Sequence, residues 1–243
     1  MAPVMVTTLR RPAVIVAAML VLGLAASGCS DQAKARRKLR KLGVPMTKEE
    51  LNARVKKGDK DVVDTLLLAG LSEDKSACTV ALCIAARQGT PPLIETLAKA
   101  GGDVNTRQGS VEGYTLLMQA ADDGLAENVR ALARVGADVN ATAGLASFTM
   151  TALHLAASHG DAATVKALVE SKANVSPEVT WMSDRVTPLH MAAVKGDIPT
   201  VEALLAGGAD INARTEKGKT PLALARENDR GPMAEFLRSR GAS

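Results

Sequence analysis

The chain has 243 residues, of which 47% are hydrophobic and only 2% are aromatic. This length and apolar content exclude a wholly disordered chain and favour a core of closely stacked helices built from Ala, Leu, Val and Ile. The net charge is +4, from 30 basic and 26 acidic residues, but residues 1–47 hold eight basic residues and one acidic residue. The remainder therefore carries −3, which argues against a nucleic-acid-binding surface on the folded part.

The N-terminal segment has the parts of an export signal. Arg10 and Arg11 precede an apolar run over residues 13–26, which is shorter than the ~20 residues that a membrane span needs. Ala-Ser-Gly then precedes Cys29. This segment resembles a bacterial lipoprotein signal, in which that cysteine is lipidated and becomes the first residue of the mature protein. An ordinary cleaved signal, or an uncleaved anchor that leaves Cys29 unused, is the alternative.

Residues 1–28 are thus expected to be a signal peptide and residues 29–47 a basic tether. The tether carries six basic residues between Lys34 and Lys41. Such charges either attract anionic lipid head groups or form a solvated linker. The lipoprotein resemblance, with Ser30 after the cysteine, implies an exported protein that faces the periplasm, on the outer membrane rather than the inner one.

The residues from 48 to 243 carry an internal repeat. Similar segments surround Thr115, Thr151, Thr187 and Thr220, spaced 36, 36 and 33 residues apart, and a degenerate copy covers residues 80–86. Each unit closes with a variant of Gly-Ala-Asp-Val-Asn. The pattern resembles the ankyrin repeat. This resemblance implies an all-α solenoid of helix-turn-helix units with β-hairpin loops, about six units including both caps.

Local signals fit this register. The Thr residues should cap the inner helices, and Thr47 with Glu50 forms a capping-box pattern that opens an atypical first unit. Pro92, Pro199 and Pro232 mark the starts of second helices. A glycine near the end of each unit should stop the second helix in a left-handed conformation, and Lys172 replaces that glycine once.

The motifs give no sign of an enzyme. His154 and His190 occupy the histidine of the repeat signature, where the ring is implied to bond within and between repeats rather than to bind metal. No phosphate loop and no nucleophile motif is complete, so we expect no cofactor and no catalytic residue.

Cys78 and Cys83 are the only cysteines besides Cys29. With Cys78 placed before the helix that holds Cys83, a chain reversal could bring them to disulfide distance in an oxidising compartment. Two small buried thiols and a redox role are the alternatives.

Partner contacts are expected on the hairpin tips and the inner helices. Two hairpins carry three extra residues each, over residues 143–148 and 177–182, and hold half of the four aromatic residues. Exposed aromatic and Met side chains are typical interface anchors; packing of the two tips on each other is the alternative. The candidate residues are Tyr114, Asp122, Asp123, Phe148, His159, Trp181, Met182 and Lys195.

The favoured function is a periplasmic lipoprotein that binds another protein and is held to the membrane by its lipid. Similar bacterial proteins suggest two roles: immunity against an exported toxin, or support of an envelope or oxidative-stress enzyme such as a catalase. A redox protein that uses Cys78 and Cys83, and a structural envelope element held by the tether, are the other hypotheses.

Overall fold

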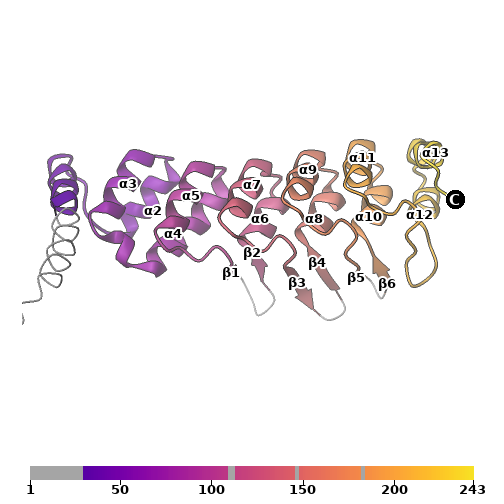
Figure 1. The fold of residues 1–243 in the computed structure, drawn as a ribbon, viewed down its shortest axis with the longest axis horizontal. Coiled ribbons are helices and arrows are strands. Elements are labelled where there is room, and N and C mark those ends of the chain that lie inside the picture. Colours follow the sequence, from indigo (N-terminus) through magenta and orange to yellow (C-terminus); the bar gives the residue numbers. More distant parts are fainter. Residues whose placement is uncertain (1–29, 109–112, 146–147, 182–183) are drawn as a thin grey trace, which may run out of the picture.

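The computed structural model describes residues 30–243 apart from 109–112, 146–147 and 182–183. From residue 48 onwards its helices form consecutive pairs, which stack into an elongated solenoid (Figure 1). These helices are α2 (Lys48–Lys56), α3 (Lys60–Leu68), α4 (Lys75–Gln88), α5 (Pro91–Lys99), α6 (Leu116–Asp122), α7 (Ala126–Arg134), α8 (Ala152–His159), α9 (Ala162–Glu170), α10 (Pro188–Lys195), α11 (Ile198–Ala206), α12 (Pro221–Glu227) and α13 (Gly231–Ser239). This is the helical repeat architecture that the sequence predicts.

The pairs form two layers. The first helix of each pair stacks in an inner row from α2 to α12, and the second stacks in an outer row from α3 to α13. The recurring alanine pairs of the inner row are fully buried, namely Ala120, Ala121, Ala156, Ala157, Ala192 and Ala193. Their small side chains let adjacent inner helices pack closely, so the core is a continuous strip between the two rows.

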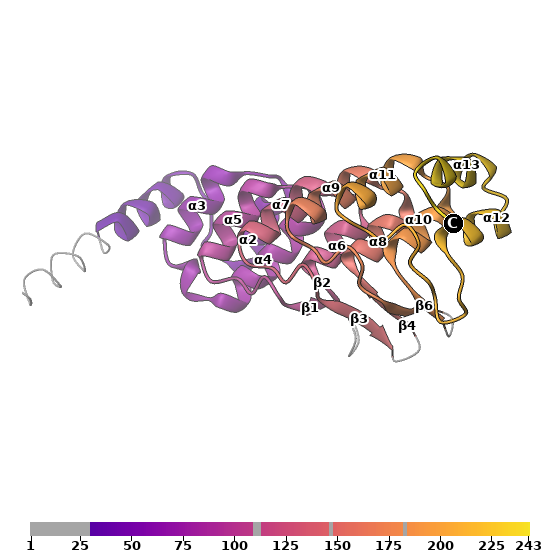
Figure 2. The same ribbon diagram turned by 45° about the vertical axis from the view of Figure 1, so that its right-hand side comes forward.

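Three antiparallel hairpins project from the inner row (Figure 2). They pair β1 (Arg107–Gln108) with β2 (Tyr114–Thr115), β3 (Thr142–Leu145) with β4 (Phe148–Thr151), and β5 (Val179–Trp181) with β6 (Asp184–Val186). Hydrogen bonds tie each hairpin to the next. Arg107 Nη1 donates to Thr142 O over 2.9 Å, and Thr180 N donates to Thr149 Oγ1 over 3.3 Å.

The helices begin at the capping threonines and prolines that the sequence predicts. The threonines Thr115, Thr151, Thr187 and Thr220 are the N-caps of α6, α8, α10 and α12. The predicted prolines lie at the starts of α5, α11 and α13. Thr47 caps α2 by accepting a hydrogen bond from Glu50 N over 3.1 Å, but the Glu50 carboxylate pairs with Arg54 instead of returning to the cap. Only half of the predicted capping box is therefore formed.

The N-terminal boundary differs from the prediction. Residues 30–41, expected within a basic tether, form a helix that bears on the first unit, with Ala35 and Leu39 buried. Arg36 Nε donates to Ala69 O over 2.8 Å at the end of α3. The folded body therefore begins before residue 48, because a short apolar stripe among the basic residues covers the end of the solenoid. No helix in the described part of the chain is both long and apolar enough to cross a membrane.

Lys172 keeps the backbone of the glycine that it replaces. Its φ is 64°, while the equivalent Gly101, Gly136 and Gly208 have φ between 91° and 95°. A side chain in this left-handed region costs about 1 kcal/mol, and Lys172 is exposed. Replacing Lys172 with glycine should therefore raise the free energy of unfolding by about 1 kcal/mol, measured as a higher urea midpoint at unchanged slope. Lys172→Ala keeps a side chain at the strained backbone position and should not raise the free energy of unfolding. An equal rise for Lys172→Ala and Lys172→Gly would show that the lysine side chain, rather than the backbone, causes the effect.

Neighbouring units are also joined outside the core. An asparagine oxygen at the end of a unit accepts a hydrogen bond from a backbone N–H of the next unit, as Asn105 does from Asp138, Asn140 from Asn174 and Asn212 from Ser243. Ion pairs join successive outer helices, namely Glu95 with Arg134, Arg130 with Glu170, and Glu202 with Arg240.

In the part of the chain that the structure describes, the joint between α9 and α11 has neither of these links. Ser176 takes the asparagine position of the unit that holds α9. Within the described residues, its side chain makes no hydrogen bond to Asp210 of the next unit. Nor does an ion pair among these residues join α9 to α11. The α9–α11 joint therefore relies on core packing, on the hairpins and on the hydrogen bond from His154 to Val186.

Candidate functional site

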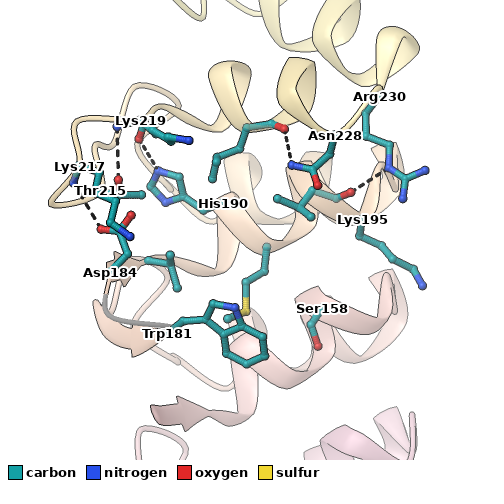
Figure 3. Close-up of a pocket in the computed structure, with 14 residues that line it drawn as sticks. Ser158, Trp181, Asp184, His190, Lys195, Thr215, Lys217, Lys219, Asn228 and Arg230 are labelled. Atoms are coloured by element: carbon teal, nitrogen blue, oxygen red, sulfur yellow. Dashed lines mark hydrogen bonds between the residues drawn. The ribbon is translucent and has the colours of Figure 1, made fainter. Parts of the chain in front are cut away.

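A groove of about 470 Å³ lies on the inner-helix face of the C-terminal half (Figure 3). It is bounded by the C-terminal part of α8, by α10 and α12, by hairpin β5–β6 and by the loop that precedes α12. The caps and the stacked core hold the inner helices, and this fixes the walls that α8, α10 and α12 supply.

The floor of the groove is apolar. Trp181, Met191, Val194 and Leu224 line it. The Trp181 ring packs against Phe148 of the preceding hairpin, with ring centroids 4.4 Å apart and planes inclined by 42°. Phe148 remains 38% exposed. The two hairpins thus pack on each other, as one alternative proposed, and still leave an aromatic surface beside the groove.

The rim of the groove carries four basic side chains and one acidic side chain. Lys195, Lys217, Lys219 and Arg230 supply the positive charge, and Asp184 supplies the negative charge. Arg230 Nε donates to Val194 O over 2.8 Å, which fixes the guanidinium at the edge between α10 and α13. Lys219 pairs with Glu227.

Asp184 is held by its own surroundings. Its carboxylate accepts hydrogen bonds from the backbone N–H of Arg185 over 2.9 Å and of Lys217 over 3.4 Å. Burial would raise the pKa of Asp184, but the hydrogen bonds from Thr215 and these two backbone groups outweigh burial and lower that pKa. The carboxylate therefore stays charged, and its bonds position the loop before α12 against β6.

A second group of predicted residues lies on α6 and α8. His159 Nε2 and Asp122 Oδ1 are 2.9 Å apart and bridge the exposed ends of these two inner helices. Burial and the Asp122 carboxylate raise the pKa of Tyr114, so this tyrosine belongs to the same cluster. Asp123 accepts a hydrogen bond from Gln119 of its own helix over 3.1 Å.

The structure thus places Trp181 and Lys195 in the groove, with Phe148 beside it, and Tyr114, Asp122 and His159 in the neighbouring cluster. Met182 and Cys29 lie outside the described residues.

The sequence analysis missed the side of the groove that the last unit contributes. Thr215, Lys217, Lys219, Leu224, Asn228 and Arg230 line this side. Asn228 stands eight residues after Thr220, as Lys195 stands eight residues after Thr187. Extending the register by one unit would have found Asn228. The lysines of the preceding loop have no such signal, because the fold of that loop against β6 brings them to the groove.

The cysteines require a correction. Cys78 does not precede the helix but lies inside α4, five residues before Cys83, because Asp74 caps this helix ahead of the repeat register. Five residues of α-helix rise by about 7.5 Å, which exceeds the Cα separation that a disulfide allows. Both thiols are free in the structure, and burial raises the pKa of each. A raised pKa opposes thiolate formation, so this geometry favours two inert thiols over a bridge or a redox pair.

The signature histidines bond as the resemblance implies. His154 Nδ1 lies 2.9 Å from Thr151 Oγ1, and Nε2 lies 3.2 Å from Val186 O. His190 repeats this arrangement with Thr187 and with the carbonyls of Ala213 and Lys219. A carbonyl only accepts, so Nε2 carries the proton and both rings join one unit to the next.

No cluster of three His, Cys, Asp or Glu side chains suited to a metal occurs among residues 30–243 outside the gaps given above. The site offers a shaped, positively charged surface with an apolar floor. In comparisons with known proteins, the family described as ankyrin repeats (three copies) matches residues 51–143 and 153–243. No curated protein matches the chain.

Proposed function

The chain belongs to the ankyrin-repeat family, whose repeats mediate binding to other proteins, and we propose that it binds its partner through the groove and the adjoining Phe148–Trp181 pair. Ankyrin-repeat proteins are generally binding scaffolds without catalysis. The observation that carries the proposal is the continuity of an apolar floor with an aromatic pair, the half-buried Trp181 and the exposed Phe148, on the inner-helix face. Aromatic anchors beside a pocket are where binding energy concentrates in protein interfaces.

The aromatic pair should be needed for binding. Affinity capture from crosslinked cell fractions would compare the parent with a Phe148→Ser/Trp181→Ser variant, which should retain at least about tenfold less partner. Leu68→Ser is the matched control, since Leu68 is an apolar side chain that is 61% exposed on α3, away from the groove. Circular dichroism melting shows whether each variant folds. Equal capture by a folded double variant and by the parent would refute this site.

We also propose that the protein is exported and anchored by a lipid on Cys29, facing the periplasm from the outer membrane. Support comes from the basic, apolar and small-residue order of residues 10–29. In a bacterial host that processes lipoproteins, intact-mass analysis should find residues 1–28 removed and an acylated N-terminal cysteine. Cys29→Ser should leave a protein without lipid that no longer sediments with membranes. A parent chain that starts after Cys29, or keeps residues 1–28, contradicts the proposal.

An exported partner follows from this location. A toxin neutralised by an immunity protein and an envelope enzyme that needs an accessory protein both fit such a partner. The identity of the captured protein distinguishes these two roles.

A further inference from the structure

The groove is charged oppositely to the body that carries it. Four basic residues and one acidic residue line it, with His190 buried and neutral. Residues 48–243 as a whole carry a net charge of −3. The groove therefore has a local excess of positive charge on a repeat body whose net charge is negative, and such a local excess attracts ligands of the opposite sign.

Two of the basic side chains are free to meet a ligand. No carboxylate among the described residues pairs with Lys195 or Lys217, although both lie on the rim. The nearby carboxylates have other hydrogen-bond or ion-pair partners. Asp184 accepts from Thr215 and backbone N–H groups, although the Lys217 charge also lowers its pKa. Glu227 pairs with Lys219, and Glu178 and Glu216 pair with Arg185. A bound anion would therefore not need to displace an internal ion pair to reach these two ammonium groups.

The basic groups stand on opposite sides of the apolar floor. Figure 3 shows Lys217 and Lys219 on the side of the loop that precedes α12, and Lys195 and Arg230 on the other side, with Trp181 and His190 between them. A ligand that matches this order carries negative charge at two points and an apolar group between them. A compact anion would reach one side only and would leave the floor of Trp181, Met191 and Val194 uncovered.

We infer that the groove binds an extended acidic segment of the partner protein, in which carboxylates flank an apolar side chain. The inference rests on the proposed function and adds the chemistry of the partner to it. The carboxylates meet the two sides of the rim, and the apolar side chain covers the floor beside Trp181. Raising the salt concentration weakens such binding because the lysines are exposed and their charge is screened.

Trp181 is the only tryptophan of the chain, so its fluorescence reports on the groove directly. The probes are the peptides acetyl-Glu-Glu-Leu-Glu-Glu-amide and acetyl-Lys-Lys-Leu-Lys-Lys-amide, titrated into the full chain to millimolar concentration. The acidic peptide should change the emission in a saturable, salt-sensitive way, and the basic peptide should not. Lys195→Glu/Lys217→Glu should weaken the acidic peptide about tenfold or more.

The matched control is Lys99→Glu/Lys166→Glu, which makes the same charge change at exposed positions on the outer helices α5 and α9. This variant should bind the acidic peptide like the parent. Equal weakening by both variants would reduce the effect to net charge and overturn the inference. Equal binding of the acidic and basic peptides, or no saturable response to either peptide, would also overturn the inference.

Two further results separate the inference from the proposed function. In the first, capture of the partner depends on Phe148 and Trp181 while the acidic peptide gives no response. That result would support the binding function and overturn the inference that the partner offers an acidic segment. Oligothymidylate that binds more tightly than the peptide, and is weakened by Lys195→Glu/Lys217→Glu, would make the groove a polyanion site and overturn the inference as well.

Discussion

Replacing Asn128 with aspartate is expected to destabilise the protein by about 4 kcal/mol. Asn128 lies on α7 and is fully buried. Its Nδ2 donates to the carbonyl oxygens of Ala85, over 3.3 Å, and of Ala86, over 2.6 Å. These carbonyls end the preceding inner helix α4, so the amide joins two units. A carboxylate of the same shape would remove both donated bonds and bury a charge that faces two oxygens.

The register supplies a control for this experiment. Thr164 and Thr200 occupy the position of Asn128 in the following two units, so Asn128→Thr should cost only about 1–2 kcal/mol in urea unfolding. The loss in free energy of unfolding caused by Asn128→Asp should become smaller as the pH falls. Burial raises the pKa of the introduced carboxyl group and favours its neutral form in the folded state. Equal losses for the two variants at all pH values would show that the effect is steric.

Acid should destabilise the protein through His154, by about 3 kcal/mol between pH 7 and pH 4. Burial lowers the pKa of His154 from 6.5 to about 4, against the hydrogen bond to Val186, which raises it. The unfolded chain therefore takes up a proton near pH 6.5, whereas the folded chain resists protonation until about pH 4. The stability is complete above pH 6.5 and is lost as the pH falls through this window. Burial also lowers the pKa of His190, which adds to the effect.

Carboxylates titrate below pH 5 as well, so the histidine contribution needs a matched variant. Met118 holds the position of His154 in the preceding unit, and His154→Met keeps an apolar side chain of accepted size there. The variant should be less stable at pH 7, since it loses the bonds to Thr151 and Val186. Its further loss between pH 7 and pH 4 should be smaller than that of the parent by about 3 kcal/mol. Parallel urea-unfolding curves against pH for the two proteins would contradict the assignment.

The repeat register predicts what local chemistry decides. Thr115 and Thr151 cap their helices, Gly136 and Gly208 follow second helices with positive φ, and Pro199 stands in the first turn of α11, because each depends on a few adjacent backbone groups. The two signature histidines also follow from the register, since every unit repeats the same neighbours.

Features that depend on contacts between distant segments could not be predicted from the sequence. The six basic residues between Lys34 and Lys41 predict a tether. Ala35 and Leu39 nevertheless lie one helical turn apart and are buried against the first unit. The free charge of Lys195 and Lys217 likewise depends on where Asp184 and Glu227 make their bonds. No spacing within the sequence encodes such competition between ion-pair partners.

The joint between α9 and α11 lacks an outer ion pair among the described residues, and the packing of the helices and hairpins on its two sides holds it together. In a linear array, each unit is stabilised by its own fold and by coupling to its neighbours. Opening at this joint would separate the C-terminal units together as one block and would expose backbone amides on both sides of the joint. Acid would promote this opening, because opening lets water reach the His154 ring, whose burial opposes protonation in the closed solenoid. A ligand in the groove would oppose it, because Ser158 and Met191 contact the ligand from opposite sides of the same joint.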